Sequence, residues 1–148
     1  VLLAELTTLP NSELESILDL IELFKLLPNE AIEQAFLALL KEVEEQHKII
    51  EELYHHYITD NATALYRMSI DRELMLKGYP EESHDFWWNF YDNTIRVSRN
   101  YAWLPHLERF IIEGGAFIAI GAAHLYGEEG VLLRLKERGY QITPIIFD

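Results

Sequence analysis

The 148-residue chain contains no cysteine and few basic residues, with 12 lysines and arginines against 25 aspartates and glutamates. The absence of cysteine excludes disulfides, thiolate zinc sites and cysteine nucleophiles. The net charge of −13 argues against nucleic acid or an anionic membrane surface as a partner. No apolar run approaches the roughly 20 residues that a transmembrane helix needs. With 49% apolar residues, the composition is that of one globular domain, residues 1–148.

The chain begins with the apolar run Val1-Leu2-Leu3-Ala4, without an initiator methionine or a signal-peptide pattern. This run predicts a strand, and Glu5 then lies at its carboxyl end. Because a chain rarely begins inside a buried strand, we expect the sequence to lack the N-terminal part of its domain.

The stretch from Ala116 to Phe147 predicts a strand–helix–strand unit. Residues 117–120 are uniformly apolar, which is typical of a strand buried on both faces. A short helix is expected between Gly130 and Gly139, followed by a second extended, isoleucine-rich run. Parallel sheets bind ligands just beyond the carboxyl ends of their strands. His124 falls at that place, so it is the first candidate for a functional residue.

Between the N-terminal strand and this C-terminal unit, the apolar periodicity predicts helices over about 12–27, 29–59, 61–77 and 81–100, and a further helix beginning at Pro105. The predicted architecture is α/β: a small, mostly parallel sheet with an inserted helical bundle and the C-terminal strand–helix–strand unit.

The longest predicted helix has apolar residues at heptad-like spacing, interrupted by Gln46. They are Ile32, Phe36, Leu39, Val43, Ile50, Leu53 and Tyr57. Such a row of residues packs against another helix. We expect that helix to belong to the same molecule, with a helix of a partner molecule as the alternative.

Two patterns in the helical part invite functional interpretations. Glu44–His47 and Glu52–His55 share the Glu-x-x-His spacing of di-iron bundles, but both lie on one predicted helix and cannot converge on one metal pair. We predict a solvated face with i,i+4 pairs instead. The aromatic residues of 86–91 are expected to form core, with a binding groove as the alternative.

The residues around His124 also resemble a known family signature. Gly121-Ala122-Ala123-His124-Leu125, followed by Gly127, Gly130 and Gly139-Tyr140, resembles the C-terminal signature of the TraB/GumN family, which includes the Tiki-type metalloproteases. Arg99-Asn100, followed by Trp103, stands where that signature begins. The resemblance covers the last third of the chain well and the helical part in general pattern, so the chain is interpreted as the C-terminal portion of the family domain.

Two departures from the family pattern matter. Tyr126 stands where the family usually has proline, and a second Gly-x-x-His motif, which the family carries nearer its N-terminus, does not occur in this sequence. If both motifs are needed for a metal site, this chain carries half of one.

The resemblance implies a metal-dependent hydrolase of the peptidase type. It makes His124 and Glu5 the metal ligands, with one of them activating water, and Arg99 the residue that binds a substrate carboxylate or stabilises an oxyanion. Asn100 and Trp103 would complete the substrate site, in a polar cleft that His124 shares with Glu5 and Arg99. Carboxylate and imidazole together suit zinc, manganese or iron, and the expected cofactor is a divalent metal such as zinc, manganese or cobalt. The expected substrate is a peptide or small molecule, and the expected compartment is the bacterial periplasm or the exterior.

Two alternatives stay open. The first is a non-catalytic binding or assembly module that uses the helical hairpin and aromatic groove, including as a homo-oligomer; the missing second Gly-x-x-His and the heptad spacing favour it. The second is a metal-free hydrolase in which His124 and a carboxylate act as general acid and base. A serine hydrolase with a Gly-x-Ser-x-Gly elbow is not expected, because that motif is absent.

Overall fold

The computed structural model describes residues 12–145, which form helices and no strand. In chain order the elements are α1 (Ile17–Lys25), α2 (Asn29–Lys41), α3 (Val43–Ile58), α4 (Ala62–Ser69), α5 (Arg72–Met75), the 3₁₀-helix η2 (Glu81–Ser83), α6 (His84–Trp88), the π-helix η3 (Asn89–Val97), α7 (Ser98–Glu113), α8 (Ala122–Leu125) and α9 (Val131–Glu137). None of these helices is long and apolar enough to cross a membrane.

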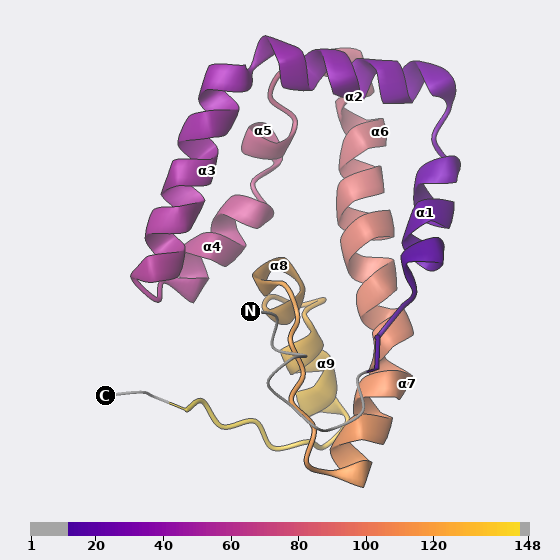
Figure 1. The fold of residues 1–148 in the computed structure, drawn as a ribbon, viewed down its shortest axis with the longest axis vertical. Coiled ribbons are helices and arrows are strands. Elements are labelled where there is room, and N and C mark those ends of the chain that lie inside the picture. Colours follow the sequence, from indigo (N-terminus) through magenta and orange to yellow (C-terminus); the bar gives the residue numbers. More distant parts are fainter. Residues whose placement is uncertain (1–11, 146–148) are drawn as a thin grey trace.

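The helices form two legs joined by a crosspiece (Figure 1). In that view α2 lies across the top, with α3 descending from one end and the run α6–η3–α7 forming the other leg. Helices α8 and α9 lie beside the lower part of this second leg, and α9 packs against α7.

The predicted α/β architecture is wrong for the described residues, because they contain no strand and hence no sheet. The two runs expected to pair are 117–120 and 141–147. Residues 117–120 and the described part of the second run, 141–145, lack regular secondary structure. Ile118 and Ile120 pack against the core below α7, whereas Phe117 is 79% exposed. A segment with one face on the core and no neighbour to share backbone hydrogen bonds does not become a sheet. The third predicted strand, residues 1–5, lies outside the described residues.

The predicted helix of residues 29–59 is two helices, because the chain bends at Glu42, whose φ of −112° and ψ of 25° are not helical. Six of the seven heptad-spaced apolar residues are exposed, so the expectation that they pack within the molecule is wrong. The opposite face of α2 is the buried one. There Ala31 packs in the aromatic core, and Ala38 lies close to Gly78, where a larger residue would not fit.

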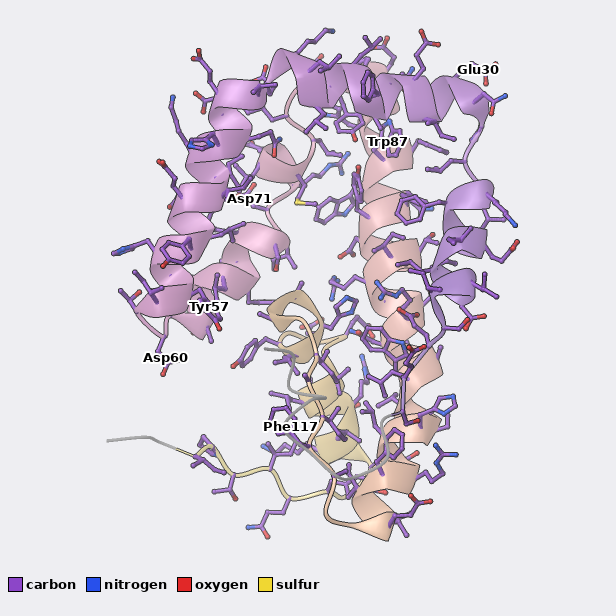
Figure 2. All side chains as sticks on the ribbon, in the orientation of Figure 1. Glu30, Tyr57, Asp60, Asp71, Trp87 and Phe117 are labelled. Carbon is purple, nitrogen blue, oxygen red and sulfur yellow. The ribbon has the colours of Figure 1, made fainter. Side chains whose placement is uncertain are left out.

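Two separate cores hold the molecule together. The upper core joins α2 to α6 and η3 through Ala31, Leu76, Trp87 and Phe90, and Figure 2 shows Trp87 beneath α2. The expectation that the aromatic residues form core is therefore confirmed for Trp87 and Phe90. The lower core is formed by residues of α7 and α9: Trp103, Leu104, Leu107, Val131 and Leu135. Residues 121–126, which carry the family signature, lie against this lower half.

The second leg is helical from residue 81 to residue 113 without a break. Pro105 lies inside α7 rather than in its first turn, so the expected new helix is wrong. The π-helical stretch ends at Val97, two residues before Arg99. Because π-helical turns are wider than α-helical ones, they change which side chains of the following helix face the core, and such stretches are frequent at functional sites.

Candidate functional site

His124 is held at the end of a short turn beside α7. Gly121 precedes α8, and the His124 amide donates to the Gly121 carbonyl at 2.9 Å, which closes the turn. The half-buried imidazole lies against the indole of Trp103, with 4.7 Å between the ring centroids. Trp103 is one α-helical turn after Arg99 and Asn100, so the two parts of the resemblance, 24 residues apart in sequence, meet here.

Asn100 connects the turn to the helix. It is completely buried, and its Nδ2 donates to the carbonyl of Glu129 at 2.8 Å and to that of His124 at 3.3 Å. Its Oδ1 faces Nδ1 of His124 at 2.7 Å. Because an amide oxygen only accepts, Nδ1 of the neutral ring carries the proton and Nε2 carries the lone pair. Asn100 thus fixes both the orientation and the tautomer of His124.

The surroundings keep His124 uncharged. Burial lowers its pKa from 6.5 to about 4, and the nearby guanidinium groups of Arg99 and Arg96 add to the effect. The carboxylate of Glu15 and the carbonyl of Arg96 oppose it only in part. At neutral pH the ring therefore presents an unprotonated Nε2.

Arg99 is bound to a carboxylate of the protein itself. Its Nε lies 2.9 and 3.1 Å from the two oxygens of Glu15, and its Nη2 also donates to that carboxylate. Nη1 donates to the carbonyl of Ile95 at 3.1 Å, and the guanidinium lies over the Trp103 ring at 4.8 Å. This arrangement leaves less of the guanidinium free for a substrate than the sequence suggested.

Three buried donors near this cluster lack an acceptor among the described residues. They are Nη1 of Arg96, Nε1 of Trp103 and Nε of Arg134. The guanidinium of Arg96 is otherwise paired with Asp92. That of Arg134 donates to the Glu129 carboxylate at 2.8 Å, and the same carboxylate accepts from the Tyr101 hydroxyl at 2.8 Å. A buried N–H without an acceptor costs about 1–3 kcal/mol, so an ordered water or a ligand oxygen would stabilise each of these donors.

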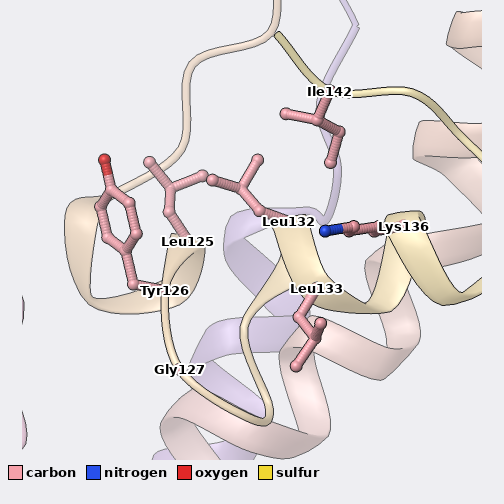
Figure 3. Close-up of a pocket in the computed structure, with 7 residues that line it drawn as sticks. All are labelled: Leu125, Tyr126, Gly127, Leu132, Leu133, Lys136 and Ile142. Carbon is pink, nitrogen blue, oxygen red and sulfur yellow. The ribbon is translucent and has the colours of Figure 1, made fainter. Parts of the chain in front are cut away.

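A shallow apolar pocket of about 300 Å³ begins at the residue after His124 (Figure 3). It lies between α8 and α9, where Lys136 is the one charged residue lining it; the others are Leu125, Tyr126, Gly127, Leu132, Leu133 and Ile142. Gly127 has a φ of +83°, and a Cβ there would lie 1.9 Å from the Tyr66 hydroxyl, so only glycine fits. This pocket is therefore apolar with a cationic edge, and His124 is not among the residues that line it. The polar cleft expected between His124, Arg99 and Glu5 stays a prediction, because Glu5 lies outside the described residues.

The described residues alone do not fit a divalent metal. Within residues 12–145 no three histidine, cysteine, aspartate or glutamate side chains gather in a way that could hold one. The two guanidinium groups that depress the pKa of His124 also disfavour a cation at its Nε2. Glu5, the predicted second ligand, lies outside the described residues. His124 thus offers one oriented nitrogen, and a metal would need further ligands from elsewhere.

The Glu-x-x-His pairs behave as predicted for a solvated face. His47 lies 3.4 Å from Glu51, and His56 lies 3.8 Å from Glu52, each one turn apart along α3. These contacts join i and i+4 neighbours within α3 and involve no second helix.

Sequence reasoning proposed Arg99, Asn100, Trp103 and His124, and the structure brings these four together. It did not propose Glu15, which lies within the helix predicted over residues 12–27. The observed capping box is Ser16 with Asp19, and Glu15 reaches Arg99. No local signal marks a partner 84 residues away.

Comparisons with known proteins give one match. No curated protein and no solved structure matches the chain. The model of the TraB/PrgY/gumN family matches residues 3–144, which is nearly the whole chain and not only the C-terminal portion that the sequence motifs suggested. The chain belongs to the TraB/PrgY/gumN family.

Proposed function

We propose that this chain is a hydrolase of peptides or small molecules, with its site at Arg99, Asn100, Trp103 and His124. One observation carries the proposal: separate parts of the family signature converge on a neutral imidazole whose tautomer is fixed and whose Nε2 is unprotonated. An oriented histidine of this kind is common to sites that bind water, substrate or metal.

The chemistry available at the site is hydrogen bonding to an acyl substrate. Nε2 of His124 accepts from a water or hydroxyl, and the unsatisfied donors of Arg96 and Trp103 suit a carbonyl or carboxylate oxygen. A base with a pKa near 4 removes protons poorly at neutral pH. His124 is therefore better suited to orient the attacking water than to deprotonate it, and a second group must activate that water.

Glu5 is the candidate for that second group, as the resemblance implies. A divalent metal enters the proposal only with ligands from outside residues 12–145, in which case Nε2 of His124 would be one ligand. Zinc, manganese or cobalt would then polarise the substrate carbonyl or lower the pKa of bound water.

The test is peptide cleavage by His124→Gln beside the parent protein. We expect a loss of about 10²-fold or more, since removing an acid–base or orienting group commonly costs that much. His106→Gln, an exposed histidine on the same helix as Arg99, is the matched control and should stay within about twofold. Assays with Zn²⁺, Mn²⁺ or Co²⁺ and with chelator determine the metal requirement. Equal activity of the His124 variant and the parent would refute the proposal.

A second candidate function is a binding or assembly module. The observation that favours it is the exposed apolar face of α1–α3 rather than the aromatic residues, because Trp87 and Phe90 are core. Sedimentation of the isolated protein and capture of helical peptides, described below, test it.

A further inference from the structure

The outward face of α2 is an apolar strip without a partner in the described part of the chain. It consists of Ile32, Phe36, Leu39, Leu40 and Val43, each at least half exposed. The spacing of four, three and one places Ile32, Phe36, Leu39 and Leu40 within about 100° of one another around α2, and Val43 follows the bend at Glu42 as the first residue of α3. On α3, Tyr54 and Tyr57 are also exposed. Figure 2 shows Tyr57 at the far end of α3 from α2.

A strip of this spacing is the surface that accepts an amphipathic helix. Apolar residues at i, i+4, i+7 and i+8 form one face of a helix, which is the pattern found in helix recognition. A contiguous exposed apolar patch on this scale marks an interaction site more often than chance surface. The strip therefore favours a helical partner over an extended one.

The charges around the strip are acidic. Residues 29–58 contain seven glutamates and two lysines. Glu33 lies about 60° around α2 from Phe36, and Glu51 about 60° around α3 from Tyr54. Of the lysines, Lys48 is bound to Glu45 at 2.6 Å, and Lys41 lies about 140° from Phe36, on another side of the helix. Carboxylates thus border the strip and lysines do not.

From this juxtaposition we infer that the strip binds a basic amphipathic helix, with apolar residues at heptad spacing flanked by lysine or arginine, in another protein. The inference rests on the second candidate function and is independent of the hydrolase proposal. Complementary charges of this kind fix the choice of partner and raise the association rate.

The same charges disfavour the other occupants. A second copy would place one acidic border against another, and each chain carries a net charge of −13. Like charges across an interface cost binding energy. An anionic membrane surface is repelled for the same reason.

The experiment uses a synthetic 18-residue helical peptide with leucines at heptad spacing and flanking lysines, and the same peptide with glutamates in place of the lysines. Fluorescence anisotropy measures the affinity at 0.15 M salt. We expect the lysine peptide to bind at least tenfold more tightly than the glutamate peptide. Phe36→Asp should weaken binding at least tenfold. Phe117→Asp, an exposed phenylalanine outside the strip, should change it less than twofold.

Two double variants distinguish the effect of the glutamates beside the strip from the effect of the net charge of the chain. Glu33→Lys with Glu51→Lys should weaken binding at least fivefold. Glu113→Lys with Glu128→Lys makes the same change in net charge far from the strip and should weaken it less than twofold, because screening at this salt acts over about 8 Å. Circular dichroism confirms that each variant is folded.

Four outcomes overturn the inference. One is equal affinity for the lysine and glutamate peptides. Another is an equal loss of affinity in the strip variants and in their controls. The third is a dimer seen by sedimentation that Phe36→Asp dissolves, which would retain the assembly function and replace the basic helix by a second copy. A monomer that binds neither peptide would refute the inference and the second candidate function together, and would leave the hydrolase proposal untouched.

Discussion

The lower half of the second leg and the crosspiece differ in which side chains they bury and which they expose. Around α7, polar groups are buried and bonded to residues far away in sequence, as Asn100 is to His124 and Glu129. On α2, large apolar side chains face outward, and the buried residues are the small Ala31 and Ala38. The first region is specified by polar contacts within the chain, whereas the second leaves its apolar surface for something outside the described residues. The predictions below test that contrast.

The largest expected difference comes from one substitution made in both regions. Leu104→Ala removes a fully buried side chain from the lower core and should lower the free energy of unfolding by about 2–5 kcal/mol, because it leaves a cavity. Leu39→Ala on α2, where the leucine is 54% exposed, should change it by less than about 0.5 kcal/mol. Urea denaturation of both variants measures the difference, and equal losses would show that the strip is buried.

Asn100→Ala tests whether the buried amide holds the site together. The change leaves Nδ1 of His124 and the carbonyls of His124 and Glu129 without their partner, which should cost about 3 kcal/mol. Asn93→Ala, which removes an exposed asparagine bonded only to Asn89, is the control and should cost under about 0.5 kcal/mol. NMR of the His124 ring should also show the loss of the fixed tautomer, which a merely local packing defect would not produce.

The contrast between the two regions also explains which parts of the fold and of the site could be predicted from the sequence. Apolar periodicity predicted most helical segments, but not the side of α2 that is buried, because Phe36 looks more like a core residue than Ala38 does. It placed strands at 117–120 and 141–147, since apolar runs of that length suit a strand, but pairing depends on neighbours that the described residues do not supply. The grouping of Arg99, Asn100, Trp103 and His124 followed from the family resemblance. The Glu15–Arg99 pair could not be predicted, because nothing near Glu15 in the sequence indicates its partner.

The pKa of His124 predicts a pH dependence of stability. Above pH 6.5 the ring is neutral in the folded and the unfolded chain, so it contributes no pH dependence. Between pH 6.5 and about 4 the unfolded chain binds a proton that the folded chain does not, so the free energy of unfolding falls with decreasing pH. The loss should amount to about 1–2 kcal/mol at pH 4, because the half-buried ring keeps part of its contact with water. His124→Gln should remove this part of the pH profile in urea titrations, and an unchanged profile would mean that the ring is not held neutral.

The smallest effects come from two glutamates near the start of the described chain. Glu15→Ala leaves the guanidinium of Arg99 largely buried without its carboxylate, which should cost about 2 kcal/mol, less than for a fully dry pair because both side chains keep some exposure. It also removes a negative charge near His124, so the pKa of that ring should fall further. Glu22→Ala on α1 breaks an exposed pair with Lys25 and should cost under about 0.5 kcal/mol, since solvent screens it. Denaturation and NMR titration of both variants measure the difference. If Glu15→Ala were as mild as Glu22→Ala, the contact with Arg99 would be a surface pair, and the site would be less well ordered than its polar contacts indicate.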